Sequence, residues 1–437
     1  MFGGNYFEPF IVTFLGIPCC MVVGLYSWLG VRWITTKNIT KNANIYGTFS
    51  FYFPLKYHLF RLILWLRRRK NSKRLQTKQA SSDGAGYGMK SRNSPEEMDK
   101  VQVLAEGYPM AVDAVYFNGV SQDGTVVVAA TARRPENYVN TVLFIKLPNV
   151  GLLEMPAMPD TWMQDEKSKT AFTAGGLLIS PVKCMEAWTI AYDGPMRSAD
   201  SGDTVHVSFN LIWKAKTAIF DFDTDIHPHA MAAAIARETW TRDFFNTLKE
   251  AHQTHYEQFG EISGLVRIEG HSDQNIKVQG VRDHSYGNVR DWKTIHRYAL
   301  NYAYLEDGSA VFIGTICMPS MLSRLDFGYV FHPDGKMDTA ERSDFEFYNW
   351  GDDGEAPEYF EVNFVAGGKK YNVKCSRAEV FYFYMGKDWD SKIHERVCNY
   401  TVNGVKGWGI SEWDYRNYAG KAVEMSRVLE GKQNRKI

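Results

Sequence analysis

The chain lacks an excess of charge of either sign. Its 437 residues carry 50 Lys and Arg against 50 Asp and Glu, so the formal net charge is zero. Proteins that bind nucleic acids present a basic surface to the phosphate backbone, and a neutral chain offers no such field overall. The composition therefore argues against a nucleic acid partner.

Cysteine is scarce, and its spacing suggests neither a zinc site nor a disulfide framework. We expect free, buried thiols in a reducing compartment and no bound metal. A phosphate-binding loop and a dinucleotide-binding turn are also missing, so we expect no cofactor. Two of the six cysteines lie in the first apolar run and the rest are scattered: Cys19, Cys20, Cys184, Cys317, Cys375 and Cys398.

The longest apolar run lies near the start of the chain. Pro9 to Val31 contains no charged residue and is long enough to cross a bilayer. We predict a transmembrane anchor over residues 1–36. A cleaved signal peptide is the alternative, but the leader has no basic region and the apolar run is longer than usual.

Residues 37–77 combine a second apolar segment with a basic cluster. Phe49 to Leu66 carries Lys56, His58 and Arg61 at helical spacing, which favours an interfacial amphipathic helix, although a hairpin through the bilayer is also possible. The run Arg67–Lys70 follows directly and suits an anionic membrane surface. By charge bias the protein is single-pass, with its folded domains in the cytosol.

Strand patterns dominate the chain after a polar, glycine-dotted linker at residues 78–98. Two blocks, 99–265 and 266–437, each open with an aromatic strand, an Asp-Gly turn and an apolar strand, as at Asp123-Gly124. The spacing indicates an all-β, mainly antiparallel barrel or sandwich. The main helical insertion is predicted at Met231 to Gln258, from its alanine-rich opening and apolar spacing.

A dense polar motif, Gly280 to Trp292, lies at the seam between the two blocks. Asp283 and His284 within it are candidate catalytic residues, since a carboxylate and an imidazole can transfer a proton. On an extended strand the two side chains point to opposite faces. The alternative is that Asp283, His284 and Arg290 form a buried hydrogen-bonded network that locks the two domains.

The order of the Asp-Gly hairpin, the central Gly-x-Arg-Asp-His-Ser-Tyr-Gly motif and the closing Gly407-Trp-Gly-Ile-Ser-Glu-Trp413 resembles AttH-like and carotenoid-hydratase-like proteins, with the yeast survival factor as a relative. The resemblance spans about Val101 to Tyr418. It implies two lipocalin-like β-barrels in tandem that hold an apolar ligand in a barrel or between them. Tyr286 stands where other members often carry Trp.

Six further residues are candidates for ligand binding: Tyr286, Arg290, Trp292, Trp408, Glu412 and Trp413. An arginine can clamp a polar headgroup, and tryptophan faces can stabilise a cationic intermediate. We expect a membrane-anchored protein that binds or transfers a lipid or isoprenoid. The alternative is a hydratase or isomerase of a hydrophobic substrate, with Asp283 and His284 as acid and base.

Overall fold

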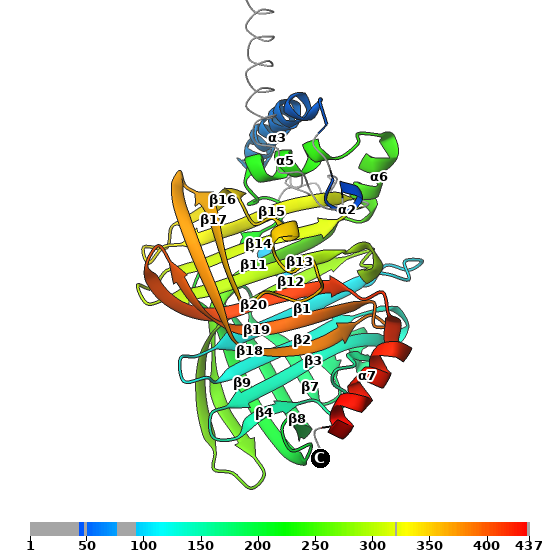
Figure 1. The fold of residues 1–437 in the computed structure, drawn as a ribbon, viewed down its shortest axis with the longest axis vertical. Coiled ribbons are helices and arrows are strands. Elements are labelled where there is room, and N and C mark those ends of the chain that lie inside the picture. Colours follow the sequence, from blue (N-terminus) through cyan, green and yellow to red (C-terminus); the bar gives the residue numbers. More distant parts are fainter. Residues whose placement is uncertain (1–42, 48–49, 77–92, 320, 435–437) are drawn as a thin grey trace, which may run out of the picture.

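The computed structural model describes residues 43–47, 50–76, 93–319 and 321–434. Two antiparallel β units lie one above the other, and most helices gather at one end of the molecule (Figure 1). This confirms the expected mainly antiparallel β architecture. The predicted anchor at residues 1–36 lies outside the described part of the chain.

The first β unit is a twelve-stranded sheet. Its strand pairings also form a closed circuit, because β9 pairs with β8 on one side and with β11 on the other. The strands are β1 (Val112–Val120), β2 (Val126–Arg133), β3 (Tyr138–Leu147), β4 (Gly151–Glu154), β5 (Trp162–Gln164), β6 (Phe172–Ala174), β7 (Leu177–Lys183), β8 (Ala187–Ser198), β9 (Thr204–Ala215), β10 (Phe220–Asp221), β11 (Gln253–Ile268) and β12 (Gln274–Gly287).

The second β unit is a closed barrel of eight strands in sequence order. The chain passes from the first sheet to the barrel between Gly287, where β12 ends, and Arg297, where β13 begins, so the passage overlaps the end of the seam motif. Residue 265, the expected end of the first block, lies inside β11. The barrel strands are β13 (Arg297–Leu305), β14 (Ala310–Met318), β15 (Leu322–Phe331), β16 (Met337–Ser343), β17 (Tyr359–Ala366), β18 (Lys369–Met385), β19 (Ser391–Val402) and β20 (Val405–Arg416).

The two Asp-Gly hairpins form as the sequence predicts. Gly124 and Gly308 have φ of 88° and 84°, a region that glycine enters without steric cost, and each joins the first two strands of its unit. Strands such as β17 alternate buried and exposed residues, because one face meets solvent. By contrast, β1 is buried on nearly every residue, since it packs on the core of its own sheet and on the second barrel.

A row of glycines lets neighbouring strands of the first unit approach closely, and the barrel contacts the same row. Gly260 and Gly280 are directly paired, and a Cβ on Gly280 would lie 2.0 Å from the Asn118 carbonyl oxygen. The Tyr304 hydroxyl of the barrel donates to both glycine carbonyl oxygens, at 3.0 Å for Gly260. One apolar core continues across this contact, from Phe117 in the first sheet to Ile410 in the barrel.

The helical insertion is present but ends earlier than predicted. Within Met231 to Gln258 the chain forms α5 and α6, and it then enters strand β11 at Gln253. The assignment of helix to residues 253–258 was therefore wrong: these residues pair with β12 on one side, which overrides their weak local pattern. The helices are α2 (Ala43–Tyr46), α3 (Phe53–Gln76), α4 (Pro95–Asp99), α5 (Pro228–Arg237), α6 (Arg242–Glu250) and α7 (Gly420–Asn434), with 3-10 turns η1 (Pro135–Asn137), η2 (Glu166–Lys169), η3 (Trp292–Thr294) and η4 (Phe347–Asn349).

The end of the predicted linker is structured. The Ser94 hydroxyl accepts a hydrogen bond from the Glu97 backbone N–H at 3.2 Å and so caps α4. Met98 and Asp99 are buried. Residues 93–98 therefore belong to the folded part of the chain, whereas residues 78–92 lie outside the description.

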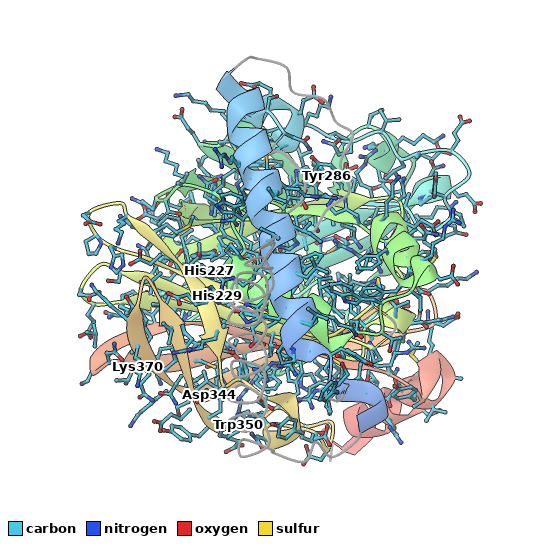
Figure 2. All side chains as sticks on the ribbon, turned by 90° about the horizontal axis from the view of Figure 1, so that it is seen from above. His227, His229, Tyr286, Asp344, Trp350 and Lys370 are labelled. Carbon is cyan, nitrogen blue, oxygen red and sulfur yellow. The ribbon has the colours of Figure 1, made fainter. Side chains whose placement is uncertain are left out.

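The apolar segment expected at the membrane interface forms α3, which lies across the outer end of the molecule and packs on α5 (Figure 2). Its Phe60 and Leu64 are buried in an apolar cluster with α5 and β15. Of the helices in the described ranges, none is long and apolar enough to cross a membrane.

Candidate functional site

A cavity of about 450 Å³ lies between the first sheet and the barrel. Strands β1, β2, β3, β11 and β12 form one wall, and strands β13, β14, β15, β18, β19 and β20 form the other. The segment from Val289 to Ile295 and the end of α6 also contribute. Most lining side chains are apolar, among them Val142, Ile226, Leu300, Ile316, Met321, Leu325, Phe327, Phe383 and Ile393.

Strand register places a polar row in this apolar cavity. Asp283 pairs with Tyr116 of β1 on one side and with Glu257 of β11 on the other. Directly opposed residues of antiparallel strands point to the same face, so all three side chains line the cavity. His255 lies on the same face, two residues along β11.

The Asp283 carboxyl differs from the other polar groups of this row in its lack of hydrogen bonds within the part of the chain that the structure describes. No hydrogen bond to it is present among the described residues, although it is largely shielded from solvent. Burial raises the pKa of Asp283 to about 7, and the nearby Glu257 and Glu412 add to the rise. His255 and Arg290 act in the opposite direction. Near neutral pH this carboxyl therefore exists in both its acid and its base form.

Glu257, which lies opposite Asp283 on the neighbouring strand, is mainly in its neutral acid form at pH 7. It is fully buried, and it accepts hydrogen bonds from the hydroxyls of Tyr302 and Tyr329 at 3.0 and 3.1 Å. Burial raises its pKa to about 8, against the effect of both tyrosines. His255 Nε2 lies 3.3 Å from Glu257 Oε1, and burial lowers the pKa of His255 to about 4. The imidazole is thus neutral at pH 7.

A second carboxyl pair adjoins the cavity from the barrel. Glu412 and Glu395 are directly opposed on β20 and β19. The Tyr298 hydroxyl donates to Glu412, and the Tyr116 hydroxyl donates to Glu395 at 2.6 Å. Burial raises the pKa of both carboxyls, and each lies close enough to influence the other. Two buried carboxyls in this arrangement titrate as a unit.

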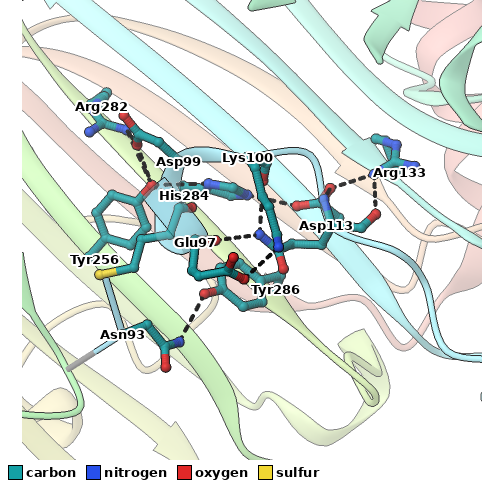
Figure 3. A network of polar contacts seen from close by, with 12 residues as sticks. Asn93, Glu97, Asp99, Lys100, Asp113, Arg133, Tyr256, Arg282, His284 and Tyr286 are labelled. Atoms are coloured by element: carbon teal, nitrogen blue, oxygen red, sulfur yellow. Dashed lines mark hydrogen bonds and ion pairs between the residues drawn. The ribbon is translucent and has the colours of Figure 1, made fainter. Parts of the chain in front are cut away.

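His284 lies on the other face of β12, away from the cavity. It is fully buried inside the first β unit, where Nε2 lies 2.7 Å from Asp113 Oδ1 and Nδ1 lies 3.1 Å from the Tyr256 hydroxyl (Figure 3). Phe172 packs edge-on against the imidazole ring. The structure therefore separates the two candidate catalytic residues, as the alternation of a strand requires.

The network around His284 ties α4 to the first sheet. Arg282 NH1 donates to Asp99 Oδ1 at 2.8 Å, and the Tyr256 hydroxyl donates to the same oxygen at 2.6 Å (Figure 3). The Arg282 guanidinium also lies 5.1 Å from the centre of the Trp213 ring. The buried network proposed as an alternative role for His284 thus exists, but it lies within the first unit and includes neither Asp283 nor Arg290.

Of the six predicted ligand-binding residues, Arg290, Trp292 and Glu412 line the cavity. Arg290 Nε donates to the Gln253 side chain at 2.7 Å. The Trp292 indole N–H has no hydrogen-bond partner among the described residues.

The other three predicted residues lie elsewhere. Tyr286 is on the His284 face, where its hydroxyl accepts a hydrogen bond from the Asn93 amide at 3.2 Å. Trp408 Nε1 donates to the Val120 carbonyl oxygen between the two units. Trp413 is fully buried inside the second barrel, on the opposite face of β20 from Glu412.

The sequence did not reveal His255, Glu257, Tyr116, Tyr298 or Glu395 as site residues. Two of them fell within the stretch assigned to a helix, where no strand face could be read. The other three reach the site through pairings between distant strands, which single-strand periodicity does not specify. Within the described ranges, no three His, Cys, Asp or Glu side chains are grouped so that they could hold a metal ion.

Fold and site together define a protein of two antiparallel β units with an acid-lined apolar cavity between them. The chain matches the model of a family of unknown function, DUF8627, over residues 22–415, and it belongs to that family. No curated protein matches the chain.

Several solved structures are similar to this chain at a low level. Kievitone hydratase from Nectria haematococca is 11% identical with a TM-score of 0.44, covering 77% of this chain and 98% of its own. An AttH protein from Nitrosomonas europaea is 11% identical with a TM-score of 0.43, covering 72% and 98%. CghA with Sch210972 is 10% identical with a TM-score of 0.45, covering 76% and 98%.

Proposed function

We propose that this protein is an enzyme that protonates and deprotonates an apolar substrate, as a hydratase or an isomerase does, with Asp283 as the acid and base. The observation that carries the proposal is the Asp283 carboxyl itself. It faces an apolar cavity, has no hydrogen bond from the described residues, and has its pKa raised to about 7 by burial. A carboxyl with a pKa shifted toward neutral pH in a cavity is typical of catalytic sites.

The reaction is a proton transfer to a carbon–carbon double bond. The neutral Asp283 gives its proton to one carbon, which leaves a carbocation on the other carbon and a carboxylate on the enzyme. In hydration, water adds to the cation and the carboxylate takes back one proton from it. In isomerisation, the carboxylate instead removes a proton from a neighbouring carbon, and the double bond moves. In both cases Asp283 returns to its starting form.

Other cavity residues support these steps. The Trp292 ring lines the cavity and offers an aromatic face to the cation. Asp283 becomes an anion when it gives up its proton, and Arg290 is close enough to stabilise that anion. His255 is neutral at pH 7, so it can accept a hydrogen bond from the adding water. His284 has no part in the chemistry in this proposal.

The cavity also selects the substrate class. Its volume of about 450 Å³ falls within the usual range of small-molecule sites, about 300–1,000 Å³, and its walls are mostly apolar. A lipid chain or an isoprenoid with one or more double bonds fits both the walls and the proposed chemistry.

The test uses the full chain in deuterated water with a panel of unsaturated fatty acids and linear isoprenoids. Hydration would add one water, with one deuterium bound to carbon. Isomerisation would exchange hydrogen for deuterium at carbon without adding water. Mass spectrometry distinguishes the two reactions. Asp283→Asn should abolish both, while Asp200→Asn, a change of an exposed carboxylate in the turn before β9, should leave them intact. Equal turnover by both variants would refute the role of Asp283.

A second candidate function is binding or transfer of the same apolar ligand without turnover, which the apolar walls favour on their own. In that case the protein would retain a lipid through purification, and Asp283→Asn would keep or improve its affinity. Bound ligand that never gains deuterium in the parent protein would support this candidate over the enzyme.

A further inference from the structure

Helix α3 is apolar on two sides. Phe60 and Leu64 are buried against α5 and β15. The opposite side is also apolar, yet it meets solvent, with exposed fractions between 44% and 53%. We refer to the latter as the outer face of α3; it consists of Leu55, Leu59, Leu62, Trp65 and Leu66.

The residues of the outer face form one continuous surface. Leu55, Leu59, Leu62 and Leu66 follow one another at steps of four, three and four residues, which places them along one side of the helix. Soluble proteins rarely expose a contiguous apolar surface of this kind unless another surface covers it. Figure 2 shows that, of the elements that the structure describes, α3 lies outermost at this end of the molecule.

The helix is also strongly and uniformly charged. It contains eight Lys and Arg residues and no Asp or Glu, in a chain whose total charge is zero. Arg67 and Arg69 are exposed where the outer face ends. The Arg69 guanidinium lies 5.4 Å from the centre of the Trp65 ring, so apolar and basic groups share one surface.

We propose that the outer face of α3 docks on an anionic lipid bilayer, with its leucines and Trp65 among the acyl chains and its arginines at the headgroups. Interfacial helices combine these features: a leucine and tryptophan face, basic flanks and no acidic residue. A second copy of the chain is a poor fit, because two such helices would bring like charges together. This inference does not depend on the proposed catalytic function.

The test places an environment-sensitive fluorophore on the outer face of the full chain. The label is attached at Leu62→Cys, in a background where Cys19, Cys20 and Cys184 are replaced by serine. A matched control carries the label at Val182→Cys, which is also exposed and belongs to β7, a strand labelled in the lower half of Figure 1. Vesicles of phosphatidylcholine with phosphatidylserine are compared with vesicles of phosphatidylcholine alone.

We expect a blue shift of the label at position 62 with the anionic vesicles only, and none at position 182. The double variant Arg67→Gln and Arg69→Gln should lower the ratio of docked to undocked label roughly 25-fold, since each basic residue near an anionic surface contributes about fivefold in affinity. Arg68 is left unchanged, because it donates to the carbonyl oxygens of Thr224 and Ile226.

Three results would overturn the proposal. The label at position 62 could show no shift with either vesicle, or an equal shift with both, which would remove the role of anionic lipid. It could also be blue-shifted before vesicles are added, which would mean that another part of the chain or a second copy already covers the outer face.

Discussion

Replacing Asp283 with asparagine should stabilise the protein while it removes the proposed activity. An asparagine has nearly the same shape as the carboxyl, but it never ionises. The Asp283 carboxyl has its pKa raised from 3.8 to about 7 by burial, so the folded protein holds the proton more tightly than the unfolded chain does. Its cost to stability is absent below pH 3.8, grows between pH 3.8 and 7, and is complete above pH 7.

The magnitude follows from this shift of about 3 pKa units, each worth about 1.4 kcal/mol, which gives an upper limit of about 4 kcal/mol. Water that enters the cavity screens the charge, so we expect about half of this gain, roughly 2 kcal/mol at pH 8 and about 0.8 kcal/mol at pH 5. With an unfolding entropy of about 2.1 cal/mol/K per residue, 2 kcal/mol corresponds to a rise in Tm of about 2 °C.

The assay compares Tm at pH 5 and pH 8 for the parent, Asp283→Asn and the exposed control Asp200→Asn. The gain for Asp283→Asn should be about two and a half times larger at pH 8 than at pH 5, while the control should change little at either. A lower Tm at pH 8 would show that the Asp283 carboxylate forms a stabilising contact in the fold, and an equal gain at both pH values would show that burial does not raise its pKa. Either outcome would remove the main support for its proposed catalytic role.

Three further predictions concern the groups around the cavity. Glu257→Gln should flatten the decline of the free energy of unfolding between pH 4.5 and 8, because burial raises the pKa of Glu257 to about 8. Urea unfolding across this pH range measures the decline, and a decline as steep as in the parent protein would contradict the prediction. Asp99→Ala should lower the free energy of unfolding by about 3–5 kcal/mol, because the Arg282 charge stays buried without its partner. Asp99→Asn should recover part of the loss in the same unfolding assay. An Asp99→Ala variant as stable as the parent would count against the network. Trp292→Ala should weaken binding of an unsaturated lipid at least tenfold, as calorimetry would show, and should also lower Tm because Trp292 is buried in the apolar core; equal affinity would place the ligand away from η3.

Much of the fold could be predicted from the sequence because its signals are local. The Asp-Gly turns at Gly124 and Gly308 and the alternation of the strands depend on neighbouring residues only. The seam motif also marks the change from sheet to barrel. The site, by contrast, depends on register: Tyr116, Glu257 and Asp283 become neighbours only through two separate strand pairings. Before those pairings are known, His284 is as good a candidate as His255.

The pleat of β12 directs the side chains of the seam motif to two different faces, which the sequence presents as one group. Arg282 and His284 point into the first β unit, where an ion pair and hydrogen bonds fix the strand to α4 and β1. Asp283 lies between them and points outward, with no hydrogen bond from the described residues. A carboxyl that has no hydrogen bonds can keep a fixed position only if its backbone is rigid. The contacts of Arg282 and His284, on either side of Asp283, provide that rigidity. The buried network therefore fixes the strand that carries Asp283, and in the proposed function it would position this carboxyl without touching the substrate.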